Sequence, residues 1–186
     1  MNNRMVMVAA AVVGFAAVGC NSKVTGGGSL RGLDGDRATF TANFDSCKGI
    51  DQAQGGFLYK DKNSDVSVKG DLVYISAPLP GWCDFVGGLG VNGVNGGAAS
   101  ISYMAVARWE SRNPKQPGSG TALLCVRDAG EGKKADSADF VAVGLWRDVD
   151  GLGGFLTSPP FHTNSGTLQG NIQSHDCSSP TSPGPT

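Results

Sequence analysis

The chain of 186 residues has no run of basic residues and almost no net charge. Its 15 lysine and arginine residues face 16 aspartate and glutamate residues, which gives a formal net charge of −1 at pH 7. Proteins that bind nucleic acid carry a basic patch, and polybasic segments bind anionic lipid. The sequence therefore predicts no nucleic acid partner and no membrane contact through a polybasic segment.

The residue patterns of common enzymes are also missing. There is no G-x-S-x-G motif and no C-x-x-C pair, and the only histidines are His162 and His175. Serine hydrolysis requires a nucleophile activated by histidine. The Asp-Gly segments at 34–36 and 148–151 fit hairpin turns, with a calcium site as the alternative. We expect no catalytic residue, no metal site and no cofactor; the alternative is a small hydrolase that uses His162 or His175 with a nearby acid.

No segment shows the 3.6-residue apolar spacing of a capped helix, so we expect little helix. Apolar and polar residues instead alternate over 38–44 and 65–74, which is typical of half-buried strands. The polar residues 61–64 precede the second of these segments and predict an antiparallel hairpin. Further strands are expected at 101–109, 122–127, 140–146 and 167–174.

The strand at 140–146 is apolar at nearly every position, which indicates that both of its faces are covered. Many short strands separated by glycine- and proline-rich turns are typical of sandwiches and barrels. The sequence therefore predicts an all-β fold, either an antiparallel β-sandwich or a partly closed barrel, stabilised by disulfides.

A short apolar stretch, residues 5–18, follows the positive charge of Arg4 and ends just before Cys20. This pattern is that of a secretory signal peptide, and a cysteine directly after the cut indicates a bacterial lipoprotein in which Cys20 is acylated. The alternative is an uncleaved anchor helix, but the stretch is shorter than the about 20 apolar residues that span a bilayer. We predict a signal peptide at 1–19, a lipidated tether at 20–25, a single β domain at 26–177 and a disordered tail at 178–186.

Four cysteines follow Cys20, and an even number in an exported chain implies two disulfides with three possible connectivities. Among these we favour Cys47 with Cys177 and Cys83 with Cys125. The first pair would join the end of an early strand to the end of the last one. Each bridge would close a long loop and add about 2–4 kcal/mol of stability.

Seven short motifs follow one another along the chain. They are Gly-Gly-Gly-Ser-Leu at 26–30, Ala-Thr-Phe at 38–40, a Gly-to-Asp strand at 55–61, Val-Lys-Gly at 68–70, Val-Arg-Asp-Ala-Gly-Glu at 126–131, Asp-to-Phe at 136–140 and Gly-to-His at 166–175. Their order resembles that of a group of secreted bacterial β domains, the post-COAP-1 type. The glycine-rich segment 87–97 and the extra cysteines depart from that pattern. The resemblance implies a β fold in an exported setting and no catalytic residue.

Six aromatic side chains are candidates either for the core or for an exposed interaction surface. Trp109 and Trp146 lie on predicted strands and are expected in the core. The other four lie among loop residues, so we expect some of them to form an exposed interaction patch; they are Trp82, Phe85, Phe155 and Phe161.

The preferred function is a non-catalytic binding or structural role in the bacterial cell envelope. The partners expected are the membrane, through the anchor, and an envelope protein or glycan. Asn21 rather than aspartate follows Cys20, which resembles the sorting pattern for the outer membrane, facing the periplasm or the surface. A second alternative to this role, beside the hydrolase, is an inhibitor of an exported enzyme.

Overall fold

The structure is a computed structural model that describes residues 22–32, 37–49, 52–76, 78–91, 101–130, 138–147, 155 and 157–177. The predicted signal peptide, Cys20 and the predicted disordered tail lie outside these residues, as does most of the glycine-rich segment 87–97. The strands are β1 (Ser22–Gly32), β2 (Arg37–Asp45), β3 (Gln54–Asp61), β4 (Val66–Ile75), β5 (Leu79–Pro80), β6 (Ile101–Ser111), β7 (Ser119–Arg127), β8 (Phe140–Arg147) and β9 (His162–Asp176). Helix α2 (Trp82–Gly88) lies between β5 and β6. No helix within the described ranges has the length and apolar character needed to cross a membrane.

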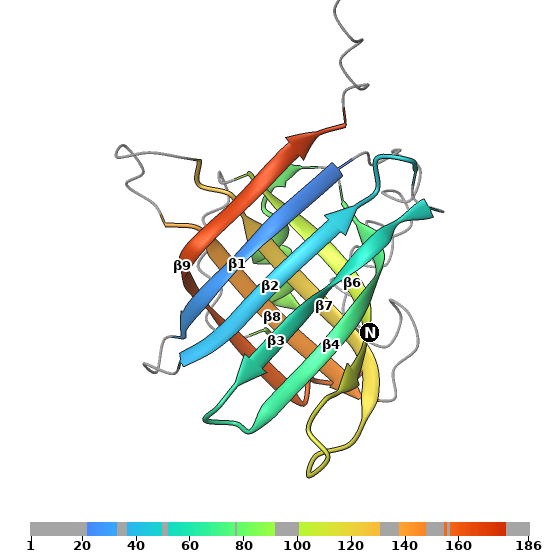
Figure 1. The fold of residues 1–186 in the computed structure, drawn as a ribbon, viewed down its shortest axis with the longest axis vertical. Coiled ribbons are helices and arrows are strands. Elements are labelled where there is room, and N and C mark those ends of the chain that lie inside the picture. The colour runs from blue at the N-terminus through green and yellow to red at the C-terminus, as the bar shows by residue number, and fades with distance from the viewer. Residues whose placement is uncertain are drawn as a thin grey trace, which may run out of the picture.

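Eight of the strands form one closed antiparallel barrel (Figure 1). Most strands pair with the next one along the chain, β4 pairs with β6, and β1 pairs with β9 to close the ring. The short strand β5 extends the sheet beside the start of β6. The predicted all-β, disulfide-stabilised fold is therefore confirmed, and the architecture is the barrel rather than the sandwich.

Alternation along each strand sends one set of side chains into the barrel. On β2, buried and exposed residues alternate along nearly the whole strand, and Phe40 and Phe44 are fully buried. Tyr59 from β3 and Trp109 from β6 are 1% and 3% exposed. These large rings fill the interior, so the barrel is a packed core.

The seam between β1 and β9 is built from glycine. Gly28 lies opposite Gly170 in the antiparallel register. A Cβ on either glycine would run into the backbone of the other strand. The glycines at this seam therefore permit the close approach that completes the ring.

A second apolar layer covers one outer side of the barrel. Helix α2 packs with Trp82, Cys83 and Val86 on the outward side chains of β6, β7 and β8, where Phe155 also packs. Nearly every residue of β8 is buried, because one face meets the barrel interior and the other meets this layer. The prediction of a strand covered on both faces is confirmed.

Two disulfides fasten the layers and the strand ends. Cys47, just after β2, pairs with Cys177, just after β9, and Cys83 in α2 pairs with Cys125 on β7. This is the favoured connectivity. The first bridge joins the end of β2 to the end of β9, the two strands that pair with β1. The second joins α2 to the barrel strand β7.

Two local expectations are wrong. The tether predicted at 20–25 is wrong for residues 22–25, which form the first part of β1, because their backbone pairs with β9 and, from Lys23 on, with β2. The loop predicted around Trp82 and Phe85 is wrong as well, because both residues lie in α2. A seven-residue helix is too short to show the repeated apolar spacing that identifies longer helices.

β9 runs on past the point where its pairing with β8 ends. Two carboxylates accept hydrogen bonds from the backbone of β9 in this part. Asp139 is 7% exposed and accepts the backbone N–H of Ile172 at 2.6 Å and that of Ala129 at 2.9 Å. Asp128 accepts the backbone N–H and the hydroxyl of Ser174, each at 2.8 Å. Partial burial raises the pKa of Asp128, but the hydrogen bonds from Ser174 and Gly130 outweigh it and hold this pKa below its ordinary value.

We predict that Asp139→Asn destabilises the barrel, since an amide nitrogen would replace one of the two accepting oxygens and leave a backbone N–H unpaired. The expected loss is about 1–3 kcal/mol in the free energy of unfolding, measured by urea titration. The matched control, Asp71→Asn, changes an exposed carboxylate on β4 and should stay within about 0.5 kcal/mol of the parent protein. Equal stability of the two variants would contradict the bridging role of Asp139.

Candidate functional site

The two ends of the barrel differ in what they carry. At one end, here called the terminal rim, β1 begins, β9 ends and Cys47 pairs with Cys177. At the other, here called the hairpin rim, the β3–β4 and β6–β7 turns project, β8 ends and β9 begins. The terminal rim lies at the top of Figure 1 and the hairpin rim at the bottom.

A buried polar cluster, made of Tyr59, Asp61, His162 and Asn164, lies inside the barrel at the hairpin rim. The Tyr59 hydroxyl is 2.9 Å from His162 Nε2 and accepts a hydrogen bond from the Asn164 amide at 3.0 Å. The Asp61 carboxylate lies 3.7 Å from the same nitrogen of His162. The side chains of Asp61 and His162 are only 2% and 9% exposed, so their partners replace water.

Strand alternation brings these groups together. Tyr59 and Asp61 continue the inward series of β3 that begins with Phe57. On β9, His162 lies opposite Leu145 and Asn164 lies opposite Val143, whose side chains belong to the interior core. The chain turns directly after β3 because Asp61 Oδ1 accepts the backbone N–H of Asn63 at 2.9 Å.

His162 is held in its neutral form at pH 7. Burial lowers the pKa of His162 below its ordinary value, and the nearby Asp61 carboxylate offsets only part of that effect. The tilted rings of Tyr59 and His162, with centroids 5.5 Å apart, add packing to the hydrogen bond. The cluster is therefore a fixed, water-poor support beneath the rim.

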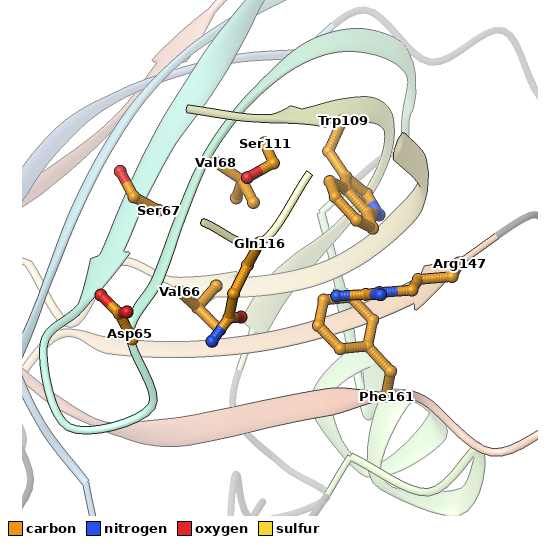
Figure 2. A pocket seen from close by; sticks show the side chains of 9 residues that line it. All are labelled: Asp65, Val66, Ser67, Val68, Trp109, Ser111, Gln116, Arg147 and Phe161. Atoms are coloured by element: carbon orange, nitrogen blue, oxygen red, sulfur yellow. The ribbon is translucent and has the colours of Figure 1, made fainter. Parts of the chain in front are cut away.

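A shallow depression lies at the surface of the same rim (Figure 2). Its empty volume is about 200 Å³, including open solvent at its mouth. Pockets that enclose a small-molecule ligand measure about 300–1,000 Å³, and this shallow depression, which is open to solvent, does not enclose one. It is lined by Asp65, Val66, Ser67, Val68, Trp109, Ser111, Gln116, Arg147 and Phe161.

An exposed aromatic and a cation form one wall of the depression. The guanidinium of Arg147 lies over the ring of Phe161, 4.5 Å from its centroid (Figure 2). The buried ring of Trp109 lies 5.4 Å from the ring of Phe161. Phe161 is 39% exposed, and the stack keeps its ring and the arginine in fixed positions. This wall presents apolar area and charge-assisted hydrogen-bond donors to a partner.

The four aromatic residues predicted to form an interaction patch do not form one surface. The expected exposure is wrong for Trp82 and Phe155, which are 8% and 3% exposed and belong to the layer outside β6–β8. Phe85 is half-buried against the same layer. Only Phe161 of the four borders the depression, at the hairpin rim. Trp109 and Trp146 are buried, as predicted.

The two histidines lie near opposite ends of β9, about 40 Å apart along the strand. They cannot share a cleft. The Nε2 atom of His162 contacts Tyr59 and Asp61, and neither of these residues is a serine or cysteine nucleophile. The ring of His175 is hydrogen-bonded to the Thr25 hydroxyl at 3.0 Å. Within the described ranges, no group of three or more His, Cys, Asp and Glu residues is arranged to hold a metal ion.

Reasoning from the sequence missed Tyr59, Asp61, Asn164 and Arg147 as site residues. The sequence does carry a signal for Asp61, because it follows Phe57 and Tyr59 at the two-residue spacing of inward side chains. The polar residues after Asp61 instead favour placing it in a turn. For Asn164 there is little signal, since the first residues of β9 are polar and do not alternate clearly.

Comparisons with known proteins give no relative: no family model, no curated protein and no solved structure matches the chain. The resemblance to the post-COAP-1 type therefore stays a prediction.

The lowered pKa of His162 makes the stability of the barrel depend on pH. As the pH falls through the ordinary histidine range, the unfolded chain binds a proton at residue 162 before the folded chain does, so the free energy of unfolding falls. The stabilising contribution of neutral His162 is complete above the pKa that histidine has in the unfolded chain. It is lost as the pH falls from that value to the lower pKa of His162 in the folded chain.

We predict that His162→Gln removes this part of the stability loss between about pH 7.5 and pH 5, measured by urea unfolding at each pH. At the higher pH the variant should lose about 1 kcal/mol, because the hydrogen bond to Tyr59 is weakened. The control Thr39→Ala, on the exposed side of β2, changes no titratable group and should keep the pH dependence of the parent. Parallel pH profiles for the parent and His162→Gln would contradict the assignment.

Proposed function

We propose that the chain is a lipid-anchored protein of the bacterial cell envelope with a non-catalytic binding role, in which the hairpin rim contacts an envelope protein or glycan. The signal-like segment that ends at Cys20 supports the anchor and export to the periplasmic or outer face of a membrane. The two disulfides support an oxidising compartment. The ordered resemblance to secreted β domains agrees with this setting.

The binding role rests on one observation, the stack of Arg147 on the exposed Phe161 beside the depression. The barrel interior is filled by its own aromatic side chains, so a partner must bind an outer surface. Phe161 is the only aromatic among the large hydrophobic side chains that are exposed in the described ranges. Aromatic and arginine side chains contribute most to binding where they are held in place against a packed surface.

The anchor is tested with Cys20→Ser expressed from the full-length gene in a bacterium that processes lipoproteins. The parent should carry acyl chains on residue 20, by intact mass, and should sediment with membranes. The variant should carry none and should move to the soluble fraction, because several buried acyl chains hold a protein far better than none. A control, Ser29→Ala on the exposed side of β1, should remain with the membranes. A parent protein that keeps its initiating methionine and no acyl chain would contradict the anchor.

The rim is tested with Phe161→Ala and Arg147→Ala, using immobilised mature protein and two probes, a detergent extract of envelope proteins and purified cell-wall glycan. Each variant should weaken capture by about tenfold or more, as expected for a residue that dominates an interface. The controls are Leu58→Ala on β3 and Arg108→Ala on β6, both exposed on the outer wall. Unchanged capture of both probes by both rim variants would contradict the proposal.

A further inference from the structure

An exposed apolar patch lies at the terminal rim, at the opposite end of the barrel from the depression. We call it the apolar rim; it consists of Pro78, Leu79, Pro80 and Ile101. Leu79 and Ile101 are 38% and 58% exposed, and Pro80 lies opposite Ile101 in the β5–β6 register. Ile101 is the most exposed large hydrophobic side chain among the described residues.

The sequence around the apolar rim is almost free of charge. Between Asp71 and Arg108 the chain carries a single charged residue, Asp84. That stretch includes the apolar rim and helix α2. Such a segment, with exposed apolar side chains and little charge, is suited to an apolar surface rather than to open solvent.

The apolar rim shares its end of the barrel with the start of β1. β6 begins where β7 ends, and β1 begins where β9 ends, so Ile101 and Ser22 belong to the same rim. In the ring of eight strands β1 and β6 stand four places apart in either direction. Ser22 and the apolar rim therefore lie on opposite walls of one barrel end.

Covalent geometry fixes how far an anchor at Cys20 can lie from this end. Consecutive Cα atoms are about 3.8 Å apart, so the Cα of Cys20 lies within about 8 Å of the Cα of Ser22. Ser22 is 2% exposed and its amide is held by the Ser46 hydroxyl at 3.2 Å, so β1 is ordered from its first residue. An acylated Cys20 would therefore hold the terminal rim at the lipid headgroups.

We propose that the apolar rim rests on the lipid bilayer, so that the barrel stands on its terminal rim and points its hairpin rim away from the membrane. This inference rests on the proposed lipid anchor. Cys20 holds one wall of the barrel end, and Leu79 and Ile101 hold the opposite wall by burying apolar area at the headgroup boundary. Among the charged groups at this end, Lys23 pairs with Asp45 at 3.7 Å, and the Asp128 carboxylate is held against Ser174 by hydrogen bonds.

The test places a nitroxide label on an engineered cysteine at Ile101 or Leu79 in the full-length, host-processed protein. The protein is reconstituted in vesicles of phosphatidylethanolamine and phosphatidylglycerol. Collision of the label with lipid-soluble oxygen is compared with collision with a water-soluble nickel chelate. The control label replaces Lys115, an exposed residue of the β6–β7 turn at the hairpin rim. Mass spectrometry without reductant verifies both disulfides and the acyl chains.

The labels at Ile101 and Leu79 should show an oxygen-to-nickel ratio at least about threefold above that at Lys115, as expected for groups that enter the headgroup region. The difference should vanish when Cys20→Ser is added. An acylated protein in which all three labels meet the chelate equally would overturn the orientation and leave the anchor standing. A chain without acyl groups would overturn the anchor and the inference together. Labels at 101 and 79 that are shielded from both reagents without vesicles would identify a protein partner instead of the bilayer.

Discussion

The structure depends on the closure of the strand ring between β1 and β9. Closure removes the two free sheet edges that an open arrangement would present, so every barrel strand is paired on both sides over part of its length. It is possible because Gly28 and Gly170 let the two backbones approach where side chains would collide. Beyond the point where the ladder between β8 and β9 ends, the carboxylates of Asp128 and Asp139 accept hydrogen bonds from β9, and the Cys47–Cys177 bridge joins the residues that follow β2 and β9. The terminal rim is thus held by covalent and polar contacts as well as by strand pairing.

Closure also determines where polar groups can be buried. The middle of the barrel is occupied by Phe40, Phe44 and other apolar side chains, so a carboxylate there would lose its water without finding partners. At the hairpin rim Asp61 is as deeply buried, but it accepts hydrogen bonds from the Ser64 hydroxyl and from the turn backbone. The Tyr59 hydroxyl and the Asn164 amide satisfy the remaining polar groups beside it. The polar cluster therefore lies at an end of the barrel, where a turn supplies donors.

Much of the fold could be predicted from the sequence, because half-buried strands alternate visibly. The strands at 37–45 and 66–75 were predicted within two residues of each end for this reason. Alternation predicts β1 only in part, since its central glycines have no side chains to alternate, and the strand predicted at 167–174 omits the beginning of β9, where the inward residues are His162 and Asn164. The aromatic candidates failed for a different reason. The burial of Trp82 and Phe155 depends on a layer packed outside the barrel, which period-two patterns on single strands do not reveal.

The division between the two rims has a physical consequence for binding. Arg147 and Phe161 lie at strand ends whose neighbours are already paired, and the rings of Trp109 and His162 lie beside the ring of Phe161. Side chains held in this way lose little conformational freedom when a partner binds, so more of the contact energy remains as affinity. The opposite end gains from the same rigidity in another way. Because β1 is ordered from Ser22, the anchor proposed at Cys20 would transmit tension or tilt to the whole barrel rather than absorb it in a flexible tether. A rigid barrel anchored so close to its first strand would hold its hairpin rim at a fixed height above the surface to which it is attached.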